Sequence, residues 1–75
     1  MHYNIQLTNK LQVALTKRES EILNFITKGY SASKISKILN LSFYTVRTHR
    51  KNILEKTSSK NTSELMKFCF ERGLI

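Results

Sequence analysis

The sequence predicts one small all-α domain of four helices, preceded by a short N-terminal arm. Three observations lead to this prediction. Proline, which fixes a backbone geometry that breaks helices, is absent from the 75 residues. The two glycines, Gly29 and Gly73, each follow a stretch with helical spacing of apolar side chains, and glycine readily adopts the left-handed conformation that ends a helix. Serine and threonine precede these stretches, at positions where such residues cap helices. We expect the arm over residues 1–15 and the domain over residues 16–75.

The arm has only weak periodicity. Its apolar residues alternate imperfectly, at Ile5, Leu7, Leu11 and Val13. This pattern therefore fits either a short helix or a strand-like segment packed on the domain. The first ten residues lack the charged head and the continuous apolar stretch of a signal peptide, and no window of the chain approaches the roughly 20 apolar residues of a membrane span.

The first helix is expected to begin at Thr16. Thr16 and Glu19 have the Thr-x-x-Glu spacing of a capping box, in which each side chain accepts a hydrogen bond from the other residue's backbone N–H. Ile22, Leu23 and Ile26 follow as an apolar stripe at helical spacing, which we expect to face the core.

A second, shorter helix is expected over residues 33–39, with Ser31 as its cap. Ile35, Ile38 and Leu39 are interpreted as its inward side, because they recur at helical spacing. About three residues connect it to the next helix, which is the spacing of a helix-turn-helix. Short helical hairpins are common in proteins, so this spacing alone does not distinguish a helix-turn-helix from other helical hairpins.

Ser42 is expected to cap the third helix, which we place at about residues 43–56. At about 100° per residue, Val46, Ile53 and the methylene groups of Arg50 point toward one side. The other side carries Tyr44, Arg47, Thr48 and Lys51. Such side chains can donate hydrogen bonds to guanine or phosphate oxygens and touch thymine methyl groups. This helix is therefore the main candidate for a contact with nucleic acid.

The fourth helix is expected to begin with Thr62 as its cap and to end near the second glycine. Leu65, Phe68 and Cys69 form its apolar stripe. Cys69 is the only cysteine, so no internal disulfide can form and a reducing compartment is expected. Its phenylalanine neighbours favour a small buried side chain over a reactive thiol.

The charge is strongly positive and unevenly distributed. The formal net charge is +8, which suits an anionic partner such as a phosphate backbone or anionic lipid. Between residues 34 and 60, Glu55 is the only acidic residue. The same segment contains Lys34, Lys37, Arg47, Arg50, Lys51, Lys56 and Lys60. Charge gathered on one segment favours a binding face over a generally solvated lysine surface, which is the plainer alternative.

Residues 15–56, LTKRESEILNFITKGYSASKISKILNLSFYTVRTHRKNILEK, closely resemble the LuxR-type (GerE-type) DNA-binding domain of bacterial transcription regulators. The shared motifs are LTxRExEIL, a glycine that closes the first helix, LxxS before the third helix, and TVxxHxxxI with a lysine three positions beyond. The match extends to about residue 65. The resemblance implies a four-helix helix-turn-helix domain whose third helix is the recognition helix in the major groove of DNA.

The resemblance also implies roles for individual residues. Arg47, Thr48 and Lys51 match the positions where such domains reach base edges, and Arg47 suits a two-pronged contact with guanine. The residues expected at phosphates are Lys34, Ser42, Tyr44, Thr45, His49 and Lys56. Several have plainer alternatives. Thr45 could extend the cap of the third helix, the imidazole of His49 could be packed and hydrogen-bonded, and Tyr44 could lie free on the surface. Arg50 could act mainly through its aliphatic stem.

The chain departs from the family pattern directly after the recognition helix. Leu-Gly-Val is common there, whereas this chain has Thr57, Ser58 and Ser59. The leucine usually packs into the core, and the glycine eases the turn because it accepts positive φ. We therefore expect a looser or differently closed junction between the third and fourth helices.

The last helix has more apolar surface than one stripe can bury. In LuxR-type proteins this helix is the usual dimerisation element, so the resemblance implies a homodimer on two DNA half-sites about one turn apart. The residues expected at the dimer contact are Leu65, Met66, Cys69 and Phe70. The alternative is that Met66 and Phe70 pack under the N-terminal arm.

The expected function is sequence-specific binding of double-stranded DNA by a bacterial transcription regulator in the cytoplasm, at the nucleoid. RNA polymerase is a second candidate partner, and the rival function is a helix-turn-helix scaffold that binds polymerase or another regulator. Enzyme activity, a cofactor and a metal site are not expected, because the chain has no aspartate and His2, His49 and Cys69 form no ligand pattern. A membrane partner is not expected either. A free-standing regulator and the output domain of a longer one both stay open, and the Met1 start slightly favours the former.

Overall fold

The computed structural model describes residues 13–73 of the chain. This range contains four α-helices and no strand: α2 (Lys17–Thr27), α3 (Ala32–Leu39), α4 (Phe43–Lys56) and α5 (Thr62–Glu71). The predicted all-α fold is confirmed. Most of the expected arm, residues 1–12, lies outside the described residues. Within the described range, no helix combines the length and the apolar character needed to cross a membrane.

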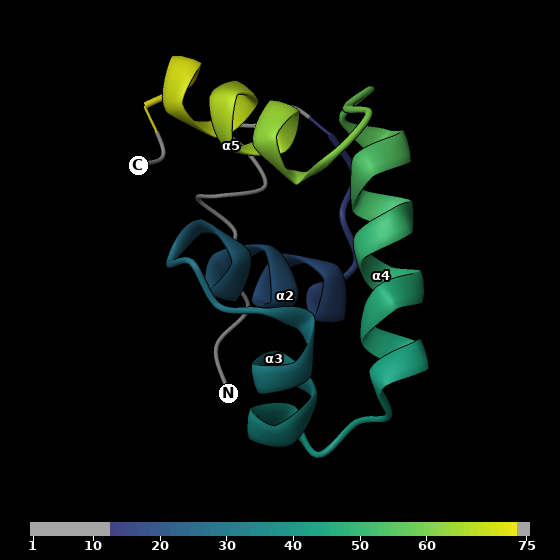
Figure 1. Cartoon of the computed structure of the whole chain (residues 1–75). Helices are drawn as coiled ribbons and strands as arrows, with labels where there is room; N and C mark the ends of the chain where they lie inside the picture. Colours follow the sequence, from purple (N-terminus) through teal and green to yellow (C-terminus); the bar gives the residue numbers. More distant parts are fainter. Residues whose placement is uncertain (1–12, 74–75) are drawn as a thin grey trace.

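α4 is the longest helix and runs along one side of the molecule (Figure 1). α2 and α3 both pack against it, and α3 and α5 lie toward its opposite ends (Figure 1). All four helices contribute to one core, which also includes a residue of the expected arm. The buried side chains of this core are Leu15, Ile22, Leu23, Ile26, Ile35, Val46, Ile53, Leu65 and Cys69. The helix that carries the candidate binding residues is therefore held from several directions.

Each helix begins at a residue whose side chain accepts a backbone hydrogen bond. The predicted capping box is confirmed: the N–H of Glu19 donates to Thr16 Oγ1 over 3.1 Å, and the N–H of Thr16 donates to Glu19 Oε1 over 2.9 Å. The predicted caps of the second and third helices are also confirmed. The predicted cap of the fourth helix is wrong by one residue, because Asn61 is the cap and Thr62 is already helical. Asparagine is at least as good a cap as threonine.

The predicted inward side of the second helix is wrong at Ile38, which is 47% exposed. In α3 the buried or half-buried residues are Ala32, Ile35, Ser36 and Leu39. These positions define one face of the helix, and Ile38 lies about 100° from the middle of that face. The short helix thus leaves one large apolar side chain in solvent near the start of α4.

The helices end in left-handed residues. The positive φ values after the four helices are 87° at Gly29, 54° at Asn40, 55° at Ser58 and 72° at Gly73. After each of the first three, the next N–H donates to the carbonyl five residues earlier, over 2.8–3.1 Å. This pattern is the Schellman motif, which satisfies carbonyls left without partners at the end of a helix. The two glycine positions were predicted, whereas Asn40 and Ser58 carry no glycine to signal the turn.

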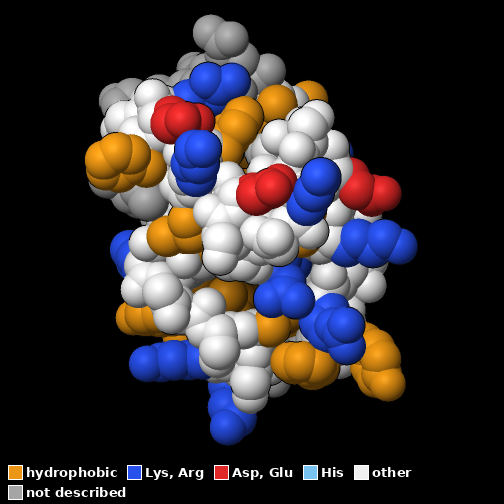
Figure 2. Space-filling view, turned by 45° about the horizontal axis from the view of Figure 1, so that its top comes forward, with side chains coloured by type: hydrophobic (Ala, Val, Ile, Leu, Met, Phe, Trp, Pro, Cys, Tyr) orange, Lys and Arg blue, Asp and Glu red, His pale blue; other side chains and the backbone are white. Residues whose placement is uncertain are grey.

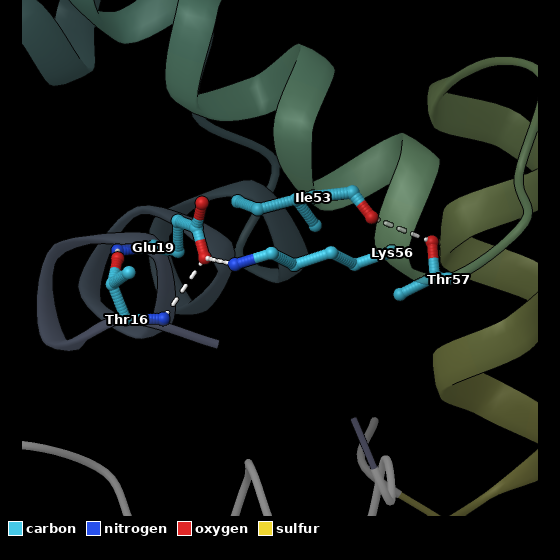
Figure 3. Close-up of polar contacts among 5 residues, drawn as sticks. All are labelled: Thr16, Glu19, Ile53, Lys56 and Thr57. Atoms are coloured by element: carbon cyan, nitrogen blue, oxygen red, sulfur yellow. Dashed lines mark hydrogen bonds and ion pairs between the residues drawn. The ribbon is translucent and has the colours of Figure 1, made fainter. Parts of the chain in front are cut away.

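The junction after α4 is closed in a way that differs from the family pattern. Thr57 stands where leucine is common, and it is only 5% exposed. Its hydroxyl donates to the carbonyl oxygen of Ile53 over 2.9 Å (Figure 3) and lies 2.9 Å from Ser59 Oγ. Of the two expectations, a looser junction or a different closure, the structure has the second. Hydrogen bonds at the helix end take the place of an apolar contact.

An ion pair between a buried carboxylate and a partly exposed ammonium links the start of α2 to the end of α4. Lys56 Nζ lies 2.7 Å from Glu19 Oε1 (Figure 3). The side chain of Glu19 is 4% exposed and that of Lys56 is 37% exposed. The same carboxylate oxygen accepts the capping hydrogen bond of Thr16, so Glu19 serves the cap and the ion pair together.

The surroundings of Glu19 lower its pKa. Burial alone would raise the pKa, but the hydrogen bonds from Lys56 and Thr16 and the positive charge of Lys56 outweigh it, so the pKa of Glu19 lies below its ordinary value of 4.5. A carboxyl group with a lowered folded-state pKa stabilises the fold above its unfolded-state pKa. This contribution is lost as the pH falls through the folded-state pKa.

Replacing Lys56 with methionine tests this ion pair. Lys56→Met leaves a buried carboxylate without its cationic partner, so we expect the free energy of unfolding at pH 7 to fall by about 1–3 kcal/mol. The loss should shrink in an acid series down to about pH 2, because protonated Glu19 no longer needs the ammonium. Urea unfolding followed by circular dichroism measures both. The control is Lys67→Met, on the exposed face of α5. A loss that stays constant with pH would contradict the account.

Replacing Ser58 with glycine tests the junction. Because a side chain at φ 55° is strained relative to glycine, we expect Ser58→Gly to raise the free energy of unfolding by about 0.5 kcal/mol, net of the greater freedom of glycine in the unfolded chain. The matched control is Ser63→Gly inside α5, which should lower it by about the same amount. Equal destabilisation by both changes would show that Ser58 is not strained.

Candidate nucleic-acid interface

α3 and α4 form the predicted helix-turn-helix. Three residues separate Leu39, the last residue of α3, from Phe43, the first residue of α4. Asn40 is left-handed, and the N–H of Leu41 donates to the carbonyl oxygen of Ser36 over 2.9 Å. Ser42 then caps α4. Every residue of the connection thus has a defined backbone role, and the angle between the two helices is fixed by short-range contacts.

α4 has the two faces that its sequence predicts. Val46 and Ile53 are 1% and 0% exposed and belong to the core. Arg47, Thr48 and Lys51 are exposed. Because Arg47 and Lys51 are exposed, both side chains are accessible to a ligand; burial would have excluded such a contact. The structure leaves the predicted base-contact residues at the surface and holds α4 by its opposite side.

The charges of the described residues are unevenly distributed over the surface. The described residues form two ion pairs with carboxylates, and the cations of these pairs are Arg18 and Lys56. Neither Arg47 nor Lys51 has a carboxylate partner within residues 13–73. The acidic side chains visible in Figure 2 lie in its upper half, beside basic ones, while the basic and hydrophobic side chains of the lower half have no visible acidic neighbour. The cations of α4 thus remain available for an external anion.

Arg47, Thr48 and Lys51 line one shallow hollow along α4. The hollow has a volume of about 410 Å³ and also includes Tyr44, Arg50 and Leu54. Tyr44 is 79% exposed, so its phenol is fully available at the N-terminal part of the helix. The three predicted base-contact residues and one predicted phosphate-contact residue are therefore brought together on a single surface.

Ser42 and Thr45 are engaged with each other at the N-terminus of α4. Ser42 Oγ accepts a hydrogen bond from the N–H of Thr45 over 3.0 Å, and the two hydroxyl oxygens lie 2.8 Å apart. Thr45 thus takes part in the cap, which was the plainer interpretation of this residue. Ser42 is exposed and Thr45 half-buried, at the positive end of the helix dipole.

Lys34 lies in the first turn of α3, on the surface. Its ammonium lies 4.6 Å from the centre of the Tyr30 ring, and that ring stacks on Phe25 with 5.5 Å between ring centres. An ammonium held against an aromatic face keeps its charge and needs no carboxylate. Lys34 thus presents a positioned charge on the first helix of the helix-turn-helix.

His49 and Arg50 lie at the border between the surface and the core. Both are half-buried. His49 Nδ1 is buried without a hydrogen-bond partner in the described part of the chain, so the interpretation of His49 as a hydrogen-bonded imidazole finds no partner at this nitrogen. Arg50 lines an apolar cavity of about 250 Å³ with Ile26, Ile35 and Met66, in agreement with a role for its aliphatic stem.

Lys56 was expected at a phosphate, and the structure gives it a different partner. Its ammonium is bound to Glu19 over 2.7 Å. The side chain of Lys56 is still 37% exposed, and an ammonium has three N–H donors. The ion pair gives Lys56 a role in the fold, and its contact with a phosphate stays a prediction.

The four residues expected at a dimer contact divide into two pairs. Leu65 and Cys69 are 0% exposed and belong to the core of the domain itself, so they cannot contact a second copy; this corrects their assignment. Burial raises the pKa of the Cys69 thiol. Met66 is half-buried and Phe70 is 68% exposed, so these two remain at the surface. Their alternative packing under the arm lies outside the described residues.

Sequence reasoning did not single out Phe43 as a site residue. Its side chain is 45% exposed, and its ring centre lies 5.7 Å from Arg47 Cζ. The spacing of four residues between an aromatic ring and an arginine on one helix could have indicated this contact.

In the described range, no group of three or more histidine, cysteine or acidic residues is placed to hold a metal ion.

The comparisons with known proteins agree with this geometry. Residues 13–69 match the model of the family described as "Bacterial regulatory proteins, luxR family". Response regulator protein VraR of Staphylococcus aureus, of Staphylococcus saprophyticus and of Staphylococcus epidermidis is 38% identical to the chain over 66 residues, which are 88% of the chain and 32% of each relative. The chain thus spans about one third of the length of these curated relatives. The helix-turn-helix and the exposed cations of α4 agree with the family match over residues 13–69. The chain therefore belongs to the luxR family of bacterial regulatory proteins, as a DNA-binding domain.

Proposed function

We propose that the domain binds double-stranded DNA sequence-specifically, with α4 in the major groove, and that it does so as part of a bacterial transcription regulator. One observation carries the proposal: Arg47, Thr48 and Lys51 are exposed together on the side of α4 that faces away from the core. The major groove admits an α-helix, and each base pair there presents a distinct set of donors and acceptors. A helix held by its apolar side can therefore offer its cationic side to base edges.

Each of the three residues suits a particular contact. The guanidinium of Arg47 can donate two parallel hydrogen bonds to O6 and N7 of a guanine, which is worth about 1–3 kcal/mol of discrimination against other bases. The ammonium of Lys51, one helical turn further on, can donate to the same acceptors on a neighbouring guanine. Thr48 offers a hydroxyl group and a methyl group, and the methyl group suits thymine.

A second set of residues would fix the register of the domain on the DNA backbone. In a helix-turn-helix the first helix crosses the backbone, which is where Lys34 on α3 carries its charge. Ser42, Tyr44 and Thr45 lie at the N-terminus of α4, where the helix dipole favours a phosphate. His49, at the border between the surface and the core, would also contact a phosphate. These contacts position the protein without reading the sequence.

The proposal extends to assembly. Met66 and Phe70 offer an apolar surface on α5 that a second copy would cover, and a symmetric pair would place two recognition helices about one DNA turn apart. The relatives are named response regulators, so the domain would be the output part of such a regulator in the bacterial cytoplasm, with RNA polymerase as a further partner.

The rival is a helix-turn-helix used to bind a protein, with its charges only steering the encounter. Two features favour DNA. The cations of α4 lack carboxylate partners in the described range, and they lie on the helix that this motif inserts into DNA. The two functions differ in salt dependence, because DNA binding weakens steeply as salt rises, according to the number of phosphates contacted.

Arg47→Ala tests base recognition. Wild type is first used to select bound sequences from a random pool of duplexes. We expect the variant to lose about 1–3 kcal/mol of discrimination for the selected sequence, with unchanged helicity and melting temperature because the side chain is exposed. Titration with selected and scrambled duplexes measures this loss. Lys67→Ala, on α5, is the control. Unchanged discrimination in Arg47→Ala would remove Arg47 from the readout.

Lys34→Ala tests the positioning contacts. We expect it to weaken the binding of selected and scrambled duplexes by the same factor and to reduce the slope of log affinity against log salt by about 1. Affinities at four or five salt concentrations provide the slope. A change in the preferred sequence would contradict a phosphate contact, since phosphates are common to all sequences.

A further inference from the structure

The aromatic side chain at the first position of α4 leaves a large part of its surface accessible. Phe43 is 45% exposed and is absent from the residues that form or cover the core. Among the described residues, the other exposed large apolar side chains are Ile38, Tyr44 and Phe70. Two of these, Ile38 and Tyr44, also lie at the end of the domain where α3 meets α4. Phe43 thus offers an accessible apolar surface at this end of the domain.

The ring of Phe43 contacts a residue already assigned to base recognition. Arg47 Cζ lies 5.7 Å from the ring centre, one helical turn further along α4, within the range of a cation–π contact. A free arginine side chain has many conformations, and ordering them on binding opposes affinity. A ring that holds the guanidinium beforehand lessens this cost.

The position of Phe43 also places its ring near the bases. In a helix-turn-helix the N-terminal residues of the recognition helix contact base edges, and Phe43 is the first residue of α4. Four residues along a helix span about 6 Å, which corresponds to about two base steps of DNA at roughly 3.4 Å each. The apolar feature of the major groove is the methyl group of thymine, with which phenylalanine can make contact.

We propose that Phe43 determines sequence specificity in two ways: its ring holds Arg47 in position for a guanine, and the same ring contacts the methyl group of a thymine within two base pairs of that guanine. This inference rests on the proposed function, since it requires α4 to lie in the major groove. It adds a base, thymine, and a residue, Phe43, that the recognition surface of Arg47, Thr48 and Lys51 does not include.

The experiment starts from the duplex that the wild-type domain selects out of a random pool. Each thymine near the preferred guanine is replaced in turn by deoxyuridine, which removes only the methyl group. We expect one replacement to weaken wild-type binding about fourfold, the value of one buried methyl group. Phe43→Ala should bind the thymine and deoxyuridine duplexes equally and should also discriminate less well against replacement of the guanine.

Two further variants separate the functions of the ring. Phe43→Leu keeps an apolar side chain but no aromatic face, so it should keep part of the response to the methyl group and lose discrimination at the guanine. Phe43→Tyr keeps the ring and should retain both. Tyr44→Ala is the matched control, because it removes the neighbouring exposed aromatic side chain; it should weaken binding without changing the response to deoxyuridine. Circular dichroism confirms that each variant is folded.

The outcomes distinguish this inference from the proposed function. If wild type selects no sequence at all, the proposed function fails and the role of Phe43 fails with it. If wild type selects a sequence and Phe43→Ala keeps both the methyl response and the guanine discrimination, only the role of Phe43 is overturned. Loss of both in Phe43→Ala, with retention in Phe43→Tyr, supports the inference.

Discussion

The packing of α4 through one side is the constraint on which the rest of the structure depends. Val46 and Ile53 are buried in the common core, and both α2 and α3 pack against the helix. A rotation of α4 about its axis would expose these two side chains and bury Arg47 or Lys51, which is costly without a partner. The apolar side therefore sets the direction in which the cationic side points, before any ligand is present.

Hydrogen bonds and an ion pair hold both ends of α4. At its start the Ser42 hydroxyl caps the helix and contacts Thr45. At its end Thr57 is buried and hydrogen-bonded, and Lys56 is bound to Glu19 at the start of α2. A rigid recognition helix loses little conformational freedom on binding. The residues that depart from the Leu-Gly-Val pattern lie directly after α4, outside the proposed DNA surface; they are Thr57, Ser58 and Ser59.

Most of the fold could be predicted from residue spacing, and the failures have physical reasons. Three of the four caps follow from local hydrogen bonding. The two faces of α4 follow from a helical period that is clear over its 14 residues. α3 has eight residues, too few for the spacing of apolar residues to show which side is buried, and Ile38 was placed wrongly. Ser58 adopts a left-handed backbone conformation, which is expected from a sequence only where it has glycine. Leu65 was misassigned because its neighbours in the core lie far away along the chain. The ion pair of Lys56 with Glu19 was missed for the same reason.

The central claim, that α4 occupies the major groove with Arg47 at a guanine, can be tested on the DNA itself. Dimethyl sulfate methylates N7 of guanine in the major groove and N3 of adenine in the minor groove, and the position of each methyl group can be read in bound and unbound fractions of the selected duplex. The account requires methylation of at least one guanine N7 of the selected sequence to exclude the duplex from the bound fraction. Binding that tolerates every guanine N7 methylation but is blocked by methylation of adenine N3 would contradict it.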